Sequence, residues 1–142
     1  MSELESRLRG LPAFPEPLPV LIEEDLPDSP DDLFLEWLDD AIKAGSRQPH
    51  AMTFATARVD GTPVGRTLIL KDVDESGYHF STHRSSRKGM EVEGNSRISM
   101  VFFWRESGRQ VRITGEAVAL SEEASQLDWR GRPSYLGVPN PD

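Results

Sequence analysis

Two pairs of alternating segments, each joined by a short turn, restrict what this chain can fold into. Residues 51–59 and 62–71 are rich in Thr, Val, Ile and Leu and flank Asp60-Gly61, where glycine accepts the positive φ of a tight hairpin turn. Residues 97–104 and 109–120 bracket a second turn that contains Gly108. With a further strand at about 78–82, the pattern predicts five strands in meander order, which favours a small barrel over a doubly wound parallel sheet.

Helices are expected only around this β core. Ser29 is placed to cap a helix over about 30–45 with Pro30 in its first turn. Shorter helices are predicted from Ser85 to Glu93 and from Ser121 through Trp129. Before them, residues 1–29 contain five prolines, which remove backbone donors. We therefore expect a proline-rich, extended or mobile arm (1–29) followed by one domain (30–142).

Composition excludes several classes of protein. No apolar run of the 142 residues approaches the roughly 20 that a membrane span needs, and the N-terminal residues do not resemble a secretory signal. The absence of cysteine rules out disulfides and thiolate metal sites and fits a cytoplasmic location. No metal site is predicted. The chain also has neither GxGxxG nor GxxxxGK[ST], so the usual glycine-rich nucleotide loops are not expected.

Charge is distributed unevenly along the chain. The net charge of −8 argues against nucleic-acid binding, and residues 1–45 hold 12 acidic and 3 basic residues. Residues 66–112 instead hold 9 basic and 6 acidic residues. Such a local excess suits a small anionic ligand, although scattered, solvated side chains would give the same counts.

Three basic clusters are candidates for that anion. They are Arg66 with Lys71, Arg87 with Lys88, and Arg109 with Gln110. In the run from Ser85 to Lys88, hydroxyls, helix N-terminal amides and an arginine fork could all donate toward a phosphate. A polar first helical turn is the alternative interpretation.

Four stretches resemble the pyridoxamine 5'-phosphate oxidase family of FMN enzymes, in the family's order and spacing. They are HAMTFAT (50–56), GRTLILK (65–71), FSTHRSSRKG (80–89) and FFWRESGRQVRITGEAV (102–118). The resemblance runs from about Asp31 to Pro133. It implies a split β-barrel that forms a homodimer, with FMN bound between the subunits.

The resemblance also implies roles for individual residues. The resemblance implies contacts with the FMN phosphate and ribityl chain from five residues: Arg66, Ser81, Thr82, Arg87 and Lys88. Thr67, Leu68 and Ile69 match the strand whose backbone meets the flavin ring, and Gln110 matches the amide that hydrogen-bonds it. Lys71 resembles the lysine that binds the substrate phosphate, and Arg132 resembles the arginine of the substrate loop. No residue is assigned as catalytic. His83 is a candidate for proton transfer, with a surface histidine as the alternative.

Three features depart from the family pattern. Strict alternation puts Arg66 and Lys71 on opposite faces of a strand, so they can serve one site only if Lys71 lies past the strand end or a bulge intervenes. Asp128 stands where the family has a substrate-binding tyrosine, and an acid there should repel a phosphate. The family's final region, which supplies further FMN and substrate contacts, is not in this sequence.

Three functions remain open from the sequence. The first is an FMN-dependent oxidase of pyridoxamine or pyridoxine 5'-phosphate. The second is a flavin oxidase of the phenazine-biosynthesis type, which resembles the chain at Ser81, Thr82 and His83 and would act on an unphosphorylated aromatic substrate. The third is a shortened flavin-binding protein without turnover.

Overall fold

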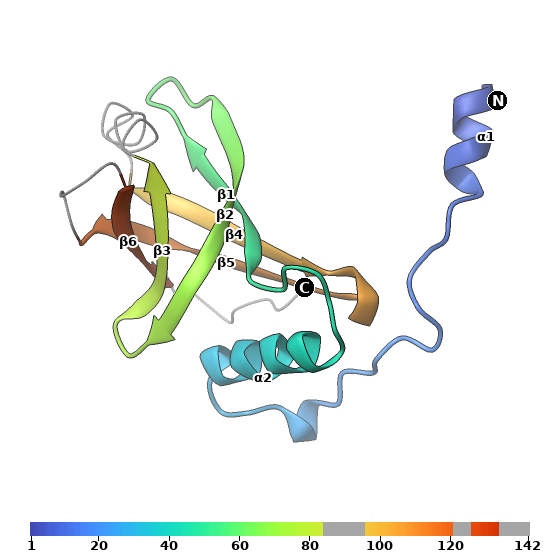
Figure 1. Cartoon of the computed structure of the whole chain (residues 1–142), viewed down its shortest axis with the longest axis horizontal. Helices are drawn as coiled ribbons and strands as arrows, with labels where there is room; N and C mark the ends of the chain where they lie inside the picture. Colours follow the sequence, from blue (N-terminus) through green and yellow to red (C-terminus); the bar gives the residue numbers. More distant parts are fainter. Residues whose placement is uncertain (84–95, 121–125, 134–142) are drawn as a thin grey trace.

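The core of the protein is a closed, antiparallel, six-stranded barrel (Figure 1). The computed structural model describes residues 1–83, 96–120 and 126–133. The strands are β1 (Ala51–Ala57), β2 (Pro63–Asp74), β3 (Gly77–His83), β4 (Arg97–Trp104), β5 (Arg109–Ala119) and β6 (Gln126–Pro133). Their order in the barrel is β1-β2-β3-β6-β5-β4, so two three-strand meanders are closed by the β3–β6 and β1–β4 pairs.

Both predicted hairpins are confirmed, and so is the predicted barrel. Gly61 and Gly108 have φ of 87° and 67°, the left-handed region that favours glycine in the two turns. The Asp60 carboxylate accepts a hydrogen bond from the Thr62 amide at 2.9 Å, which holds the first turn.

The prediction of a helix from Ser121 through Trp129 is wrong for residues 126–129, the part of this range that the structure describes. Residues 126–133 form a sixth strand, β6, which pairs with β3 on one side and β5 on the other. Without β6 both of these strands would present an open edge, so pairing outweighs the local helix propensity. The predicted helix at 85–93 lies outside the described residues.

Helix α2 (Pro30–Lys43) closes one end of the barrel, below the strands in Figure 1. Its predicted bounds are confirmed to within two residues, and the Ser29 hydroxyl accepts from the Asp31 amide as expected for a cap. Phe34 is 2% exposed and stacks edge-on against Phe102 at 4.9 Å and Tyr78 at 5.3 Å. These aromatic contacts join the helix to the barrel core.

The barrel interior is filled by large apolar side chains that alternate along the strands. The fully buried members are Met52, Phe54, Tyr78, Phe80, Met100 and Phe102. Because successive side chains on a strand point to opposite faces, this set fixes which residues of each strand face inward. None of the described helices is both long and apolar enough to cross a membrane.

The N-terminal segment is only partly the extended arm that its prolines predict. Glu3–Arg9 forms helix α1, capped by the Ser2 hydroxyl, which accepts from the Glu5 amide at 3.0 Å. Residues that follow, up to the single-turn helix η1 (Glu23–Asp25), run as an irregular strap past the barrel. The prediction of an extended arm is therefore wrong for residues 3–9, where a serine cap and well-placed charges stabilise a helix.

Candidate functional site

The segment of β2 from Arg66 to Lys71 carries the largest group of predicted site residues. Arg66 pairs with the buried Phe54 of β1, so its side chain starts on the inward side and is half-buried. Thr67 is exposed, and Leu68 pairs with the buried Met52. Arg66 and Thr67 therefore start on opposite faces of β2.

A β-bulge lies in the β2–β3 ladder at Lys71. The ladder pairs Leu70 with Phe80 and then Asp72 with His79, which leaves Lys71 as the extra residue. Leu70 is buried and faces inward like Arg66, so Lys71 directly after it starts on the outward side, and the bulge changes the alternation only from Asp72 onward. Lys71 is exposed, and the strand continues to Asp74. Of the two conditions under which Lys71 and Arg66 could serve one site, a strand end before Lys71 is wrong, and the bulge is present but leaves the two residues starting on opposite sides of β2.

Small side chains line the outer face of β1 and β2 next to this segment. Gly65 pairs with Ala55, and Thr67 pairs with Thr53. A Cβ added at Gly65 would meet only the Thr53 methyl group, at 4.0 Å. This wall could accept a planar ring. The Arg66 side chain starts on the other face of β2, and its guanidinium is a suitable donor for a phosphate. The chemistry of these side chains therefore suits the two parts of FMN, although the wall and Arg66 do not share one face of the strand. Thr53 and Ala55, which line this wall, are not among the predicted site residues.

Ser81 and Thr82 lie on β3 just beyond its last pairing with β2. They directly follow Phe80, the β3 partner of Leu70, and they pair with β6. Ser81 is half-buried and pairs with Asp128 of β6. His83 ends β3 and pairs with Gln126. The role of Ser81 and Thr82 in binding a flavin therefore stays a prediction.

Gln110 is not brought to this group within one chain. It is exposed on β5 and pairs with Phe103 of β4, and β1 separates β4 from β2. Three strand spacings amount to about 14 Å. Gln110 therefore lies on the outside of the sheet but away from Arg66 and Lys71.

The remaining predicted site residues have partial or no description. Arg87 and Lys88 lie outside the described residues. Arg132 is on β6, where its backbone pairs with Glu116 of β5, on the opposite side of β6 from β3.

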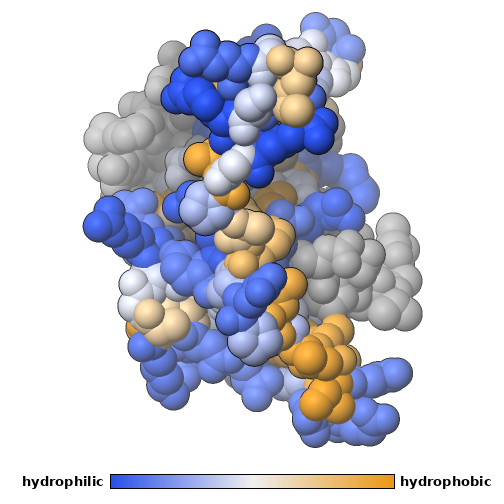
Figure 2. All heavy atoms as spheres, turned by 90° about the vertical axis from the view of Figure 1, so that its right-hand side faces the viewer, coloured by the Kyte–Doolittle hydropathy of each residue, from blue (hydrophilic) through white to orange (hydrophobic). Residues whose placement is uncertain are grey.

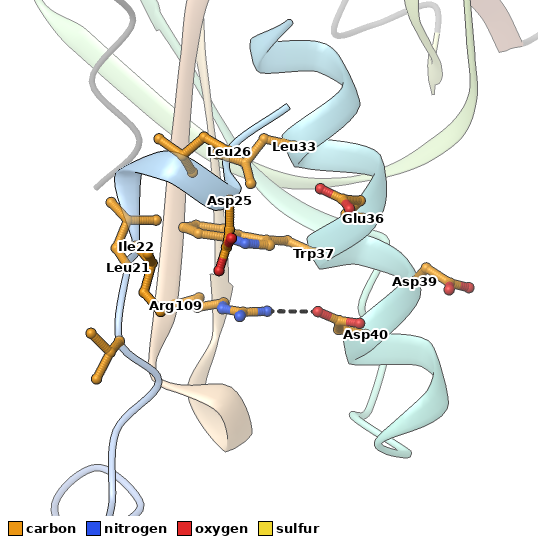
Figure 3. Close-up of a pocket in the computed structure, with 11 residues that line it drawn as sticks. Leu21, Ile22, Asp25, Leu26, Leu33, Glu36, Trp37, Asp39, Asp40 and Arg109 are labelled. Atoms are coloured by element: carbon orange, nitrogen blue, oxygen red, sulfur yellow. Dashed lines mark hydrogen bonds and ion pairs between the residues drawn. The ribbon is translucent and has the colours of Figure 1, made fainter. Parts of the chain in front are cut away.

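The third predicted basic cluster is used inside the protein. The Arg109 guanidinium donates to the Asp40 carboxylate at 2.9 Å and lies 4.6 Å from the centre of the Trp37 ring (Figure 3). Both partners belong to α2, and the arginine side chain is 21% exposed. Arg109 thus ties the start of β5 to α2, a structural role that the sequence did not show, because nothing local relates residues 37 and 40 to residue 109.

Taken with the barrel, these features define a class of protein. A closed antiparallel barrel built from two three-strand meanders is the fold of FMN-binding split-barrel proteins. The family model described as pyridoxamine 5'-phosphate oxidase matches residues 38–137. The chain belongs to this family, as the sequence resemblance implied.

Curated relatives and solved structures agree with this assignment. The chain is 42% identical over 120 residues to a pyridoxine/pyridoxamine 5'-phosphate oxidase of Rubrobacter xylanophilus, covering 83% of this chain and 55% of that protein. A Bordetella pertussis protein of the same name is 40% identical, with coverage of 84% and 58%. The chain therefore spans little more than half the length of these relatives.

Among solved structures, PhzG from Burkholderia lata, in complex with tetrahydrophenazine-1-carboxylic acid, has a TM-score of 0.72 and 25% identity, and the match covers 82% of this chain and 83% of that one. An FMN-binding protein from Nostoc punctiforme, related to pyridoxamine 5'-phosphate oxidase, has a TM-score of 0.57 and 18% identity, covering 70% of this chain and 52% of that one. The second likeness supports the fold alone.

Proposed function

We propose that this chain binds FMN through its phosphate and serves as an FMN-dependent oxidase of a small substrate. The observation that carries the proposal is the composition of β2, which combines a half-buried arginine, Arg66, an exposed lysine, Lys71, and an outer wall of small side chains that it shares with β1. Arg66, with Ser81, Thr82, Arg87 and Lys88, would hold the phosphate and ribityl chain. The backbone at Thr67, Leu68 and Ile69 would lie against the flavin ring.

When bound, FMN supplies the redox chemistry, accepting a hydride from an amine or alcohol carbon and passing electrons to O₂. The chain's own residues would bind the cofactor and the substrate and orient them toward each other. Lys71, which is exposed, would bind a substrate anion while Arg66 would stay with the cofactor phosphate, so two cations on one strand would serve two different anions. Arg132 is the second proposed substrate contact.

The homodimer is part of this proposal. Gln110 is separated from Arg66 and Lys71 by β1 and β4 within one chain. A second copy placed against the outer face of these strands would bring its own residues to the flavin and cover exposed apolar groups such as Phe103, which is 48% exposed. The cytoplasmic location remains a prediction from the lack of cysteine.

The proposed substrate is pyridoxamine or pyridoxine 5'-phosphate, supported by the names of the curated relatives. A phenazine-type oxidase of an unphosphorylated aromatic compound is the second candidate. It is favoured by the likeness to PhzG, which has a TM-score of 0.72 over 82% of this chain. Asp128, on the strand next to Ser81, bears on this choice because a carboxylate disfavours a phosphorylated substrate.

Turnover assays distinguish these candidates. FMN-loaded protein is mixed with each substrate class, and O₂ consumption is followed. Oxidation of the phosphorylated vitamin, improved by Asp128→Tyr, supports the first candidate, whereas oxidation of the aromatic compound alone supports the second. Bound flavin that can be reduced chemically but turns over neither class would contradict the oxidase proposal and leave a flavin-binding protein.

A further inference from the structure

A groove lies between α2 and the strap that leads to it. Leu21 and Ile22 of the strap and Leu33 and Trp37 of α2 form its apolar walls, with Arg109 at its base (Figure 3). Its volume is about 340 Å³. Leu21 and Ile22 remain 54% and 49% exposed. The groove therefore combines apolar walls with polar groups, and the described residues leave it open.

The rim of this groove is acidic. Its acidic members are Asp25, Glu36, Asp39 and Asp40. Arg109 is the one basic residue in the lining, and its guanidinium is bound to Asp40. An occupant with apolar side chains and a flanking cation would complement both features.

Helix α1 has this chemistry and lacks a surface to pack on among the described residues. Leu4 and Leu8 are one helical turn apart and are 59% and 57% exposed, and no residue of the helix is buried. Arg7 lies on one flank of this leucine pair, and on the other flank the Arg9 guanidinium is paired with the Glu5 carboxylate at 3.0 Å. A seven-residue helix is marginal in water on its own, so it needs a packing partner to persist.

The strap holds α1 away from the groove of its own chain. Phe14 packs edge-on against Phe103 of β4 at 6.1 Å, and Leu18 covers Gly108, where an added Cβ would lie 2.5 Å from a Leu18 methyl carbon. Beyond these anchors α1 stands apart from the barrel (Figure 1). Seen from that side, the strap runs down the face toward hydrophobic atoms at its lower end (Figure 2).

Folding back into the groove of the same chain would require these anchors to release. It would also reverse a segment that contains Pro12, Pro15 and Pro17, each of which restricts the backbone. Reaching outward to a neighbouring molecule requires neither change.

We propose that α1 docks in the groove between the strap and α2 of a second copy of this chain. Leu4 and Leu8 would lie against the apolar walls, and Arg7 would face the acidic rim. Both copies would exchange their helices, as expected for a two-fold dimer. The inference rests on the homodimer proposed above, so dimer formation is measured separately.

The absence of cysteine makes cross-linking a direct test. A Leu4→Cys, Leu21→Cys variant of the full chain is treated with a short bismaleimide and analysed on a denaturing gel and by peptide mass spectrometry. The expected product has twice the chain mass and contains a Leu4-to-Leu21 site link. The matched control replaces Leu21→Cys by Val59→Cys, at the β1–β2 turn and 76% exposed, and should give little linked product.

Three results would overturn the docking. They are a link within one chain, no link above the control, or an equally strong link to the Val59 site. Sedimentation of the unmodified chain with FMN tests dimer formation separately from the docking of α1. A flavin-bound monomer would contradict both the dimer and the docking, while the proposal of flavin binding would stand.

A second variant needs no cross-linker. Leu4→Ser with Leu8→Ser should raise the dimer dissociation constant about tenfold or more, because two leucines lose apolar burial. These residues make no buried contact within their own chain, so folding should be retained. An unchanged dissociation constant would contradict the proposal.

Discussion

Replacing Arg109 by alanine tests how the barrel is joined to α2. The change removes the ion pair with Asp40 at 2.9 Å and the stacking over Trp37 at 4.6 Å. The carboxylate partner is 58% exposed, so solvent screening limits the ion pair to about 0.5–1 kcal/mol. The cation–π contact adds about 0.5–1 kcal/mol. Arg109→Ala should therefore lower the free energy of unfolding by about 1–2 kcal/mol.

Urea denaturation followed by circular dichroism measures this loss, and a double-mutant cycle with Asp40→Asn isolates the ion pair. The coupling energy should be about 0.5–1 kcal/mol, and Arg109→Lys should recover only part of the loss, because lysine lacks the planar group that stacks on Trp37. Arg105→Ala is the control, since Arg105 is exposed on the same hairpin. If Arg109→Ala lowers the free energy of unfolding no more than Arg105→Ala does, or if the coupling energy is zero, Arg109 does not join β5 to α2 in this way.

The other predictions concern the β2–β3 turn and Lys71. The pKa of the Asp74 carboxyl is held well below its usual value by hydrogen bonds from the Ser76 hydroxyl and amide and from the His79 ring. The ionised Asp74 therefore stabilises the fold above the unfolded-state pKa of about 4, and this stabilisation is lost as the pH falls below that value. The stability difference between wild type and Asp74→Asn should accordingly shrink on acidification below about pH 4 in urea titrations, and a difference independent of pH would contradict this. Gly77→Ala should lower the melting temperature far more than Gly10→Ala, because Gly77 has a φ of 137° and its added Cβ would collide with the Gly131 carbonyl oxygen; equal melting temperatures would be inconsistent with that geometry. In steady-state assays with a phosphorylated substrate, Lys71→Ala should raise KM and leave FMN bound, whereas release of FMN would show that Lys71 belongs to the cofactor site.

The parts of the fold that the sequence predicts are those governed by local chemistry. Asp60-Gly61 and Gly108 mark their turns because only a few residues accept a positive φ. Ser29 and Pro30 mark the start of α2 for a similar reason. Alternation also places Arg66 and Lys71 on opposite sides of one strand, and the buried Leu70 before Lys71 agrees with this, although a bulge follows in the ladder to β3.

The parts that the sequence did not predict depend on contacts between distant segments. Residues 126–133 become β6 because β3 and β5 both need a partner. Arg109 was grouped with Gln110 as an anion ligand, but α2 supplies an acid and an aromatic ring for it. Helix α1 is not predicted, because the prolines that follow it indicate an extended or mobile segment. Ser2 and the charges of its first and last turns nevertheless favour a helix.

Recognition of the FMN phosphate by this chain can be measured by a flavin titration. FMN and riboflavin are titrated separately into the unliganded protein, and quenching of flavin fluorescence reports binding. The two ligands differ only in the phosphate, which Arg66, Arg87 and Lys88 would bind, each contact contributing about 1.5–3 kcal/mol. FMN should therefore bind at least about tenfold more tightly than riboflavin, and Arg66→Ala should reduce this difference in affinity. Equal affinities for FMN and riboflavin would contradict this recognition of the phosphate.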